Sequence, residues 1–395
     1  FLTKFLNKVF FMKRKGLFIA FDDLTYNPNI INDTNPSGIN GLEKKIFYQF
    51  NTFEEYGFEM SFYNPCLNRN SSIEKFTRRL PFHFLTKWDF DFNTIRNFSF
   101  IYIRKAWFMD GDLILALKKI RKISPNITIF LEIPTYPYDH EGKGVKMLPL
   151  KIKDKFWRKH LFKYVDRIVT YSDDDNIFNV PTIRLSNAID YELVKRKNIL
   201  NNVSDTFNII AVSSLYYWHG YDRAIEGLKN YYANTQHIKE LNLYIVGTGP
   251  EFDRYKELIE KYGLENHVFL TGYKSGDDLE KIYDKCIIGL DSMGRHRSGV
   301  LFNSSLKGKE YCAKGLMIVS GVKTELDLDS NFQYYMRVPA DDTPLDFTKI
   351  ANQVQKYLSC NNISDIQTKI MEYSKDNFDY SVALKPILNY INNHN

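Results

Sequence analysis

Residues 298–320 combine side-chain types whose spacing suits the binding of a phosphate group. Ser304 or Ser305 can cap a helix, because a side-chain oxygen at the cap accepts from an amide that has no partner inside the helix. Gly315 can end that helix in the left-handed conformation, and the apolar residues 316–319 then read as a short buried parallel strand. The first turn of the helix would present free N–H groups and the positive end of the helix dipole to an anion.

Charged side chains surround this expected helix start. Lys307 and Lys309 add positive charge, and Glu310 lies about one and a half turns further along. This set suits an anionic ligand that also carries sugar hydroxyls. Arg295 and Arg297 stand in the preceding loop, from which they can reach the helix start at the carboxyl edge of the sheet. The alternative interpretation of the segment is an ordinary helix–strand unit of an α/β domain.

Two strand–helix series of similar size position these side chains. In the first, apolar runs predict strands at residues 16–21, 58–63, 98–103, 126–131, 166–171 and 180–185, with helices at 42–56 and 112–122. In the second, strands are expected at 207–213, 241–246, 268–271 and 287–290, with helices at 222–233, 252–262, 276–284 and 379–392. The two series predict two doubly wound α/β domains that face a cleft.

Composition narrows the class of protein. The 395 residues leave room for two or three domains, and a net charge of +6 over this length hints at anionic partners without requiring nucleic acid. The four cysteines form no CxxC pair, which argues against a zinc site or a disulfide scaffold and suits a reducing compartment. The first turn of the first domain lacks the dinucleotide fingerprint GxGxxG. Its Gly38 and Gly41 either let backbone approach a ligand closely or simply make the turn.

A polar and aromatic loop follows the strand expected at 126–131. Two prolines stiffen this loop, and it begins outside the carboxyl end of a strand, where ligands bind in open α/β sheets. The residues expected to recognise a sugar on the acceptor side are Glu132, Tyr136, Tyr138 and Asp139. The alternative is a solvated loop whose tyrosines pack on neighbouring residues.

Basic and large apolar residues are interleaved between 143 and 161, where Asp154 is the sole acidic residue. Such a composition can hold a protein on an anionic membrane surface, and we expect Lys151, Lys153 and Lys155 to contribute. A solvated helix with one buried face has the same composition.

Residues 1–14 form an expected amphipathic extension. Its apolar residues recur at helical spacing, but the run is too short to span a bilayer and has no small-residue cleavage site. Residues 1–11 therefore either form a membrane-surface helix or precede a true start at Met12.

Six motifs, in order along the chain, resemble those of retaining GT-B glycosyltransferases of family 4, the group 1 transferases. They begin at Gly38 (GINGLEKKI), Glu132 (EIPTYPYD), Leu215 (LYYWHGYDR), Ile245 (IVGTGP), Val268 (VFLTGY) and Ser305 (SLKGKEYCAKG). The first two resemble a bacterial branch found in capsule, exopolysaccharide and lipooligosaccharide gene clusters. The resemblance runs from about residue 15 to residue 392.

The resemblance implies the GT-B fold, with two doubly wound Rossmann-like domains facing a cleft and a C-terminal helix that crosses back to the first domain. It implies an acceptor-binding domain at residues 15–190, a nucleotide-sugar-binding domain at 191–375 and the returning helix at 376–395. The implied activity is transfer of a sugar from a nucleotide-diphosphate donor to a lipid-linked or surface-glycan acceptor, with retention of configuration. Such a hexosyltransferase-like enzyme of polysaccharide biosynthesis would be cytoplasmic, and peripheral on the inner face of the cytoplasmic membrane.

Position by position, the resemblance assigns Glu310 to the ribose hydroxyls of the donor and Tyr273 to its base. The backbone amides of 303–306 would hold the donor sugar and the diphosphate, and the loop at 38–41 would close on the diphosphate. The residues expected on the donor are Gly38, Gly41, Trp218, Gly220, Gly249, Tyr273, Asn303, Ser304, Ser305, Leu306 and Glu310.

The sequence departs from the family pattern in two respects. The first glutamate of its Glu-x7-Glu motif, expected to position the donor sugar, falls at Phe302, and the Arg and Lys usually placed on the phosphates fall near Ser214 and at His219. We expect nearby cations to supply the missing charge, since arginine binds phosphate through two hydrogen bonds. The residues expected to act in catalysis are Glu310, His219, Arg295, Arg297 and Lys307.

The resemblance implies a front-face reaction, in which the acceptor hydroxyl attacks from the side that the diphosphate leaves. The protein mainly positions the substrates and neutralises the developing charge. No metal and no cofactor are expected, because the nucleotide sugar is a co-substrate. Two alternatives stay open: a GT-B transferase of a non-sugar group such as a phosphoramidate, and a non-catalytic glycan-binding partner subunit.

Overall fold

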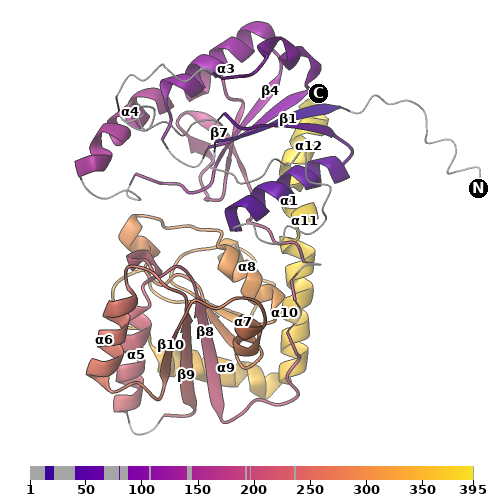
Figure 1. Cartoon of the computed structure of the whole chain (residues 1–395). Helices are drawn as coiled ribbons and strands as arrows, with labels where there is room; N and C mark the ends of the chain where they lie inside the picture. The colour runs from indigo at the N-terminus through magenta and orange to yellow at the C-terminus, as the bar shows by residue number, and fades with distance from the viewer. Residues whose placement is uncertain are drawn as a thin grey trace, which may run out of the picture. The chain divides into compact units, whose positions relative to one another are not determined.

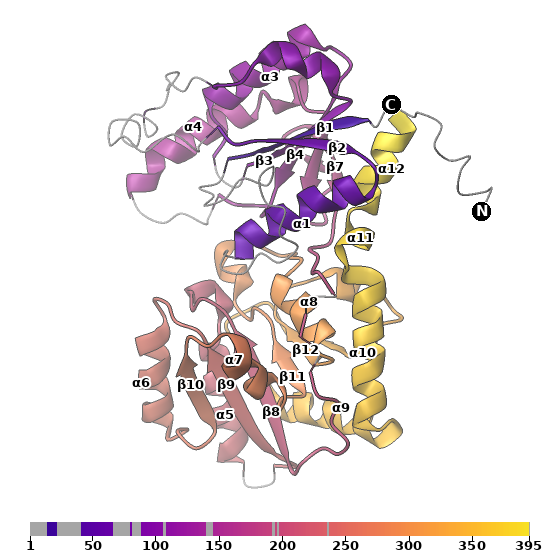
Figure 2. The same ribbon diagram turned by 45° about the vertical axis from the view of Figure 1, so that its right-hand side comes forward.

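The computed structural model describes residues 14–21, 41–65, 80, 88–105, 108–139, 145–191, 194–195, 197–234 and 237–394. The chain divides into two units (Figures 1 and 2). The N-terminal unit comprises the chain up to Leu185 together with Leu384–Asn395, and the C-terminal unit comprises Ser186–Ala383. Residues 1–13 of the expected extension at 1–14, and Gly38, lie outside the described residues.

The N-terminal unit is built on one sheet. Its described elements are β1 (Lys15–Ala20), α1 (Gly41–Glu55), β2 (Glu59–Tyr63), η1 (Phe92–Asn97), β3 (Phe100–Arg104), α3 (Gly111–Ile123), β4 (Thr128–Ile133), η2 (Val145–Met147), α4 (Leu148–Arg158), η3 (Leu161–Lys163), β5 (Arg167–Thr170), β6 (Asn176–Ile177), β7 (Val180–Arg184) and α12 (Lys385–His394). In the described chain the strand order is β2-β1-β3-β4-β5-β7-β6, and the pairs are parallel except for β6 with β7.

Helices cover both faces of this sheet because successive strand residues point to opposite sides. Leu17 and Ile19 of β1 belong to a core that includes the apolar side chains of α3. Phe18 and Ala20 belong to a second core, which α1 and α12 complete. The last helix of the chain therefore packs on the first unit, as predicted.

Helix α4 carries the basic and apolar stretch. Lys153 and Asp154 are buried, and the Asp154 carboxylate accepts from the amide of Met109 at 2.7 Å. The expectation that Lys153 contributes to a membrane-binding surface is therefore wrong, because its side chain points into the protein. Among the helices that the structure describes, none is long and apolar enough to cross a membrane.

The C-terminal unit contains an all-parallel sheet. Its described elements are β8 (Thr206–Val212), η4 (Tyr217–His219), α5 (Asp222–Ala233), β9 (Glu240–Val246), α6 (Phe252–Tyr262), β10 (Val268–Gly272), α7 (Gly276–Tyr283), β11 (Ile288–Leu290), η5 (Arg295–Ser298), α8 (Leu306–Ala313), β12 (Met317–Ser320), η6 (Glu325–Asp327), β13 (Tyr335–Arg337), α9 (Phe347–Cys360), α10 (Ile363–Phe378) and α11 (Tyr380–Ala383). The described strands follow the order β10-β9-β8-β11-β12-β13.

The winding of this sheet reverses beside its first strand. The chain runs from β8 outward to β10, returns to β11 on the other side of β8, and continues to β13. Helices α5 and α6 lie together on one side of the sheet, and α8 and α10 pack together on the other (Figure 1). The predicted doubly wound domain is confirmed, and its switch point between β8 and β11 is where such sheets bind ligands.

Candidate functional site

The carboxyl edge of the C-terminal sheet gathers most of the predicted donor residues. Because β8, β9, β11 and β12 are parallel neighbours, the turns that follow them lie along one edge. The turn after β8 carries Trp218 and His219, the turn after β9 carries Gly249, and the turn after β11 leads through Arg295 to α8. Segments up to about 90 residues apart in the chain are thus brought together by the sheet.

Two glycines let these turns pack closely. Gly220 has φ +65°, and a Cβ there would lie 2.5 Å from the amide nitrogen of Gly294. Gly249 has φ +155°, and a Cβ there would lie 2.6 Å from the Leu215 nitrogen. Both positions therefore require glycine because of the neighbouring backbone. Close approach of a ligand is not needed to explain these two glycines.

Helix α8 starts at this edge without a serine side chain capping it. Ser305 occupies the cap position, but its hydroxyl donates to the Asp291 carboxylate at 2.7 Å. The Ser304 hydroxyl accepts from the amide of Asn187 at 2.8 Å. The prediction of a serine cap is therefore wrong in its hydrogen bonding, and the first-turn amides of α8 still face outward from the helix end. Gly315, with φ +66°, follows the helix as predicted.

Lys307 places a positive charge beside this helix start. Its ammonium donates to the Ser292 hydroxyl at 2.9 Å and lies 3.4 Å from the Tyr221 hydroxyl and 3.5 Å from the Asp291 carboxylate. Burial lowers the pKa of Lys307 to about 8, against the opposing effect of Asp291. The lysine is therefore mostly charged at pH 7 and loses its proton as the pH rises through about 8.

His219 is buried and neutral at the same edge. Its Nδ1 accepts from the Tyr216 amide at 3.4 Å, and its ring stacks on Tyr221 with centroids 5.9 Å apart. Burial, and then the charges of Lys307 and Arg295, hold the pKa of His219 far below its usual range. It can position a ligand but adds no positive charge.

An aromatic pair flanks this histidine. The rings of Tyr216 and Trp218 stack with centroids 4.5 Å apart and planes 8° from parallel. The Arg295 guanidinium lies 6.0 Å from the centre of the Trp218 ring. Arg295 therefore comes from the turn after β11 to the turn after β8, as expected for a side chain at this edge.

Glu310 and Tyr273 are the residues predicted to hold the ribose and the base. Glu310 is half-buried on α8, and its Oε1 accepts from the Tyr283 hydroxyl at 3.0 Å. Tyr273 directly follows β10 and is 73% exposed, so its ring is free to stack on a ligand. Asn303 and Leu306 flank the start of α8, with Leu306 exposed.

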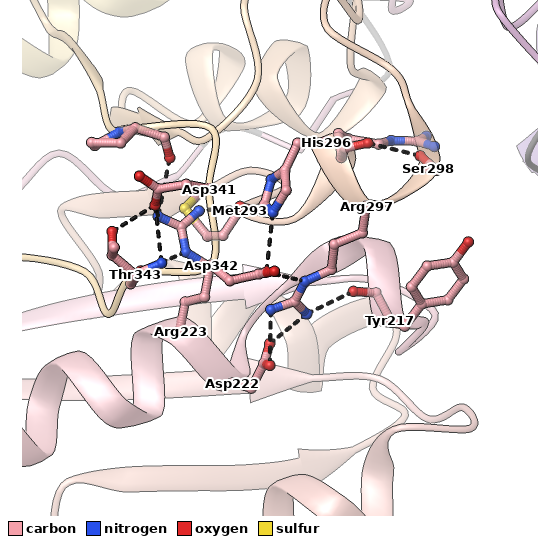
Figure 3. Close-up of polar contacts among 12 residues, drawn as sticks. Tyr217, Asp222, Arg223, Met293, His296, Arg297, Ser298, Asp341, Asp342 and Thr343 are labelled. Carbon is pink, nitrogen blue, oxygen red and sulfur yellow. Dashed lines mark hydrogen bonds and ion pairs between the residues drawn. The ribbon is translucent and has the colours of Figure 1, made fainter.

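The Arg297 side chain is bound to carboxylates. Figure 3 shows its guanidinium between Asp222 and Asp342, with hydrogen bonds of 2.6–3.0 Å to both and to the Tyr217 carbonyl. Of the two arginines predicted to bind phosphate, this one is already engaged within the unit.

The acceptor-side residues of the N-terminal unit are largely internal. Glu132 has no exposed surface, and Tyr138 is buried with its hydroxyl donating to Asp154 at 2.8 Å. Asp139 pairs with Arg158 at 3.0 Å, and Tyr136 packs edge-on against Phe178. The expected direct contact of Glu132 with an acceptor does not fit this burial, and Tyr136 and Asp139 are the more accessible members.

Sequence reasoning did not single out Asp291, Ser292 and Tyr221, which the structure places beside Lys307 at this edge. Asp291 and Ser292 immediately follow the strand expected at 287–290, so the carboxyl-edge rule applied to that strand would have found them. In the described parts of the chain, no cluster of three His, Cys, Asp or Glu side chains is arranged to hold a metal ion.

Comparisons with known proteins give one family match and several structural matches. Residues 195–290 match the family model of the glycosyl transferases group 1. No curated protein matches the chain.

Solved structures match almost the whole chain. HepE from Anabaena in complex with UDP is 14% identical, with 96% of this chain and 100% of that chain covered and a TM-score of 0.57. Sucrose-phosphate synthase from Thermosynechococcus elongatus is 14% identical (95% and 98% covered, TM-score 0.61). The lipopolysaccharide outer core galactosyltransferase WaaB is 16% identical (96% and 99% covered, TM-score 0.59). At these identities the likeness establishes the fold, and the chain has the GT-B fold of two Rossmann-like domains.

Proposed function

We propose that this protein is a glycosyltransferase that moves a sugar from a nucleotide-diphosphate donor to a hydroxyl group of an acceptor. The observation that carries the proposal is the Lys307 ammonium beside the first turn of α8, at the carboxyl edge of the C-terminal sheet. A diphosphate at this edge meets both the helix dipole and a positive charge. The match of residues 195–290 supports the donor class, and HepE has been solved with UDP and with UDP-glucose.

In the proposed reaction the bond from the anomeric carbon to the diphosphate breaks and a bond to the acceptor oxygen forms on the same face, so that configuration is retained. The proton of the acceptor hydroxyl passes to an oxygen of the leaving diphosphate. Lys307 and Arg295 neutralise the charge that develops on that group, since His219 is neutral. The protein then needs no general base of its own, no metal and no cofactor.

The donor contacts follow the same edge. We propose that Glu310 accepts from the ribose hydroxyls, that Tyr273 stacks on the base, and that the amides of 303–306 hold the diphosphate. The N-terminal unit would bind the acceptor, a lipid-linked saccharide or a surface glycan of the capsule or lipooligosaccharide type.

The experiment is transfer by the purified full-length chain. UDP-, GDP- and ADP-sugars are offered with glycolipid acceptors, and the product mass and released nucleotide are measured. We expect a mass increase of one sugar, with the anomeric coupling in the NMR spectrum reporting retention. A non-sugar mass increment would favour the phosphoramidate-type transferase, and nucleotide-independent glycan binding without turnover of any donor would favour the partner subunit.

Replacing Glu310 by glutamine should weaken nucleoside diphosphate binding by about tenfold or more, because hydrogen bonds to a charged acceptor contribute roughly 1.5–3 kcal/mol. The glutamine oxygen can still accept from Tyr283, so the local structure should persist. Calorimetry with UDP, GDP and ADP measures the loss, with the exposed Glu257→Gln of α6 as the matched control. Equal affinity in the two variants would remove Glu310 from the ribose site.

We also propose that α4 rests on an anionic membrane surface. Leu148, Ile152 and Phe156 recur every four residues of α4 and are 55%, 54% and 39% exposed. Lys155 and Lys159 are exposed beside them on the same helix and the residue that follows it. An exposed apolar stripe edged by lysines matches the apolar interior and negative headgroups of such a bilayer.

The double change Lys155→Gln with Lys159→Gln should weaken binding to vesicles containing anionic lipid by about 30-fold, at roughly 1 kcal/mol per lysine. Sedimentation with neutral and anionic vesicles measures this. Lys118→Gln with Lys122→Gln, an exposed pair at the same spacing on α3, is the matched control. Equal binding of the two variants, or binding that ignores salt, would make α4 a solvated helix.

A further inference from the structure

The Arg297 guanidinium is bound to acceptors of the protein itself, which a side chain reserved for binding phosphate would not need. Its Nη1 and Nη2 bind the two oxygens of Asp222 at 2.9 and 3.0 Å, and its Nε binds Asp342 at 2.6 Å. Nη1 also donates to the Tyr217 carbonyl at 3.0 Å. One guanidinium on η5 thus ties together η4, the start of α5 and the loop before α9 (Figure 3).

The segments joined by Arg297 are those that carry the candidate donor residues. The turn after β8 holds Trp218 and His219, and the turn after β11 holds Ser292 and Arg295. The backbones of the two turns touch where the Met293 amide donates to the His219 carbonyl at 2.7 Å. A shift of one turn against the other would therefore displace both sides of the site.

Arg223 also binds the turn after β11. Its guanidinium is buried and donates to the carbonyls of Met293, Pro339 and Thr343. The turn after β11 is thus held by one arginine through its backbone and by the other through carboxylates. In Figure 3 the Arg223 guanidinium lies beside Asp341, and the Arg297 guanidinium lies between Asp222 and Asp342.

We propose that Arg297 is a positioning residue that locks the turns after β8 and β11 into one donor-binding surface and does not itself contact the donor. The inference rests on the proposed function and reassigns a residue that the sequence placed among the phosphate cations. It leaves Lys307 and Arg295 as the side chains that face the diphosphate. The planar fork of arginine suits this task, because it meets a carboxylate through two bonds while its third nitrogen binds another group.

The sign of one substitution separates positioning from phosphate binding. If Arg297 bound phosphate, Asp342 would compete for it, and Asp342→Asn would strengthen nucleoside diphosphate binding. If Asp342 instead holds the Arg297 guanidinium in place against Asp222 and the Tyr217 carbonyl, the same change loosens the contact between the turns and weakens binding. We expect a loss of up to about fivefold, since Asp342 is 69% exposed and such pairs are weak. Asp365→Asn, the same charge change in the first turn of α10, is the control.

Arg297→Lys and Arg297→Gln supply the second readout. Lysine keeps the charge but cannot bridge Asp222, Asp342 and the Tyr217 carbonyl together, so the two variants should lose turnover to a similar extent, about tenfold or more. If Arg297 bound phosphate, Arg297→Lys would instead keep most of the turnover, because lysine retains the positive charge. The effects of Asp342→Asn and Arg297→Gln should also be non-additive in the double variant, because they break one contact.

Hydrogen exchange makes the outcome independent of the proposed activity. Loss of the lock should speed exchange of the Met293 amide, which bonds across the two turns, in both Arg297→Lys and Asp342→Asn. If the wild-type chain binds no nucleotide, the glycosyltransferase proposal fails while this measurement still decides the role of Arg297. Tighter diphosphate binding by Asp342→Asn, rescue by lysine, or unchanged Met293 exchange would each overturn the inference.

Discussion

Replacing Lys307 by methionine is expected to reduce sugar transfer by about a hundredfold to a thousandfold, the usual effect of removing one preorganised group that stabilises transition-state charge. Methionine keeps the length and much of the packing of the side chain. In the variant, the negative charge on the departing diphosphate loses the neutralising effect of Lys307, and the neighbouring His219 cannot replace it because it is neutral. Steady-state kinetics with the natural donor measures the effect, and Lys256→Met on the exposed face of α6 is the control.

The same lysine should set the alkaline limb of the pH profile. The pKa of Lys307 is lowered to about 8 by burial, with Asp291 raising it and Arg295 lowering it further. The charged form exists below this value, so kcat/KM should fall as the pH rises through about 8 in the wild type. His219 and Tyr221 face the same ammonium, but the pKa of the first is depressed and that of the second is raised, away from this range.

In Lys307→Met the remaining activity should no longer show this limb. If the variant kept both its rate and its alkaline decline, the diphosphate charge would have to be met by Arg295, and Lys307 would be an internal partner of Asp291 and Ser292.

The C-terminal fold was largely readable from the sequence. The helices predicted at 222–233 and 252–262 coincide with α5 and α6, because each is strongly amphipathic and lies between two apolar strands. Helices α9 and α10 were not predicted, although apolar residues at helical spacing, such as Phe347, Ile350 and Val354, mark the first of them. The expected helix at 379–392 is two pieces, α11 and α12, which belong to different units.

The side-chain pairing of the site was not readable in the same way. The carboxyl-edge rule predicted that Arg295 would reach the helix start that carries Lys307, and the family resemblance placed Trp218 among the donor residues. The partners of Arg297 lie 75 and 45 residues away in the chain, so its commitment to carboxylates depends on how loops meet rather than on local pattern. The same holds for Ser305, whose hydroxyl donates to Asp291 and does not cap the helix amides.

Glu132 shows the same contrast in the N-terminal unit. The sequence placed it on a ligand-binding loop, whereas the structure buries it at the end of β4. Its Oε2 accepts from the Tyr102 hydroxyl at 2.5 Å and from Gln49 at 3.0 Å. Its Oε1 pairs with Arg104 and lies 3.4 Å from the Lys45 ammonium. Burial would raise the pKa of Glu132, but Arg104 and Lys45 lower it from 4.5 to about 2.

Replacing Glu132 by glutamine should therefore lower the free energy of unfolding of the N-terminal unit by about 3–5 kcal/mol, because two buried cations lose the carboxylate that they share. Because the folded-state pKa is lowered, the ionised glutamate contributes stability above about pH 4.5, and this contribution, about 3 kcal/mol, is lost as the pH falls toward 2. The variant should lack that acid dependence. Urea unfolding followed by tryptophan fluorescence reports mainly on this unit, which contains three of the four tryptophans.

The matched control is Glu59→Gln, which removes the exposed partner of Lys15 at 2.7 Å. An exposed pair of this kind contributes at most about 1 kcal/mol, so the control should unfold near the wild-type urea concentration. A Glu132→Gln variant as stable as the control at pH 7 would mean that Arg104 and Lys45 are neutralised elsewhere. Glu132 would then not be needed for stability and could bind a ligand, provided that the surrounding residues move to expose it when an acceptor binds. A destabilised variant that still binds acceptor would instead separate the two roles, and would assign Glu132 to holding α1, β3 and β4 together.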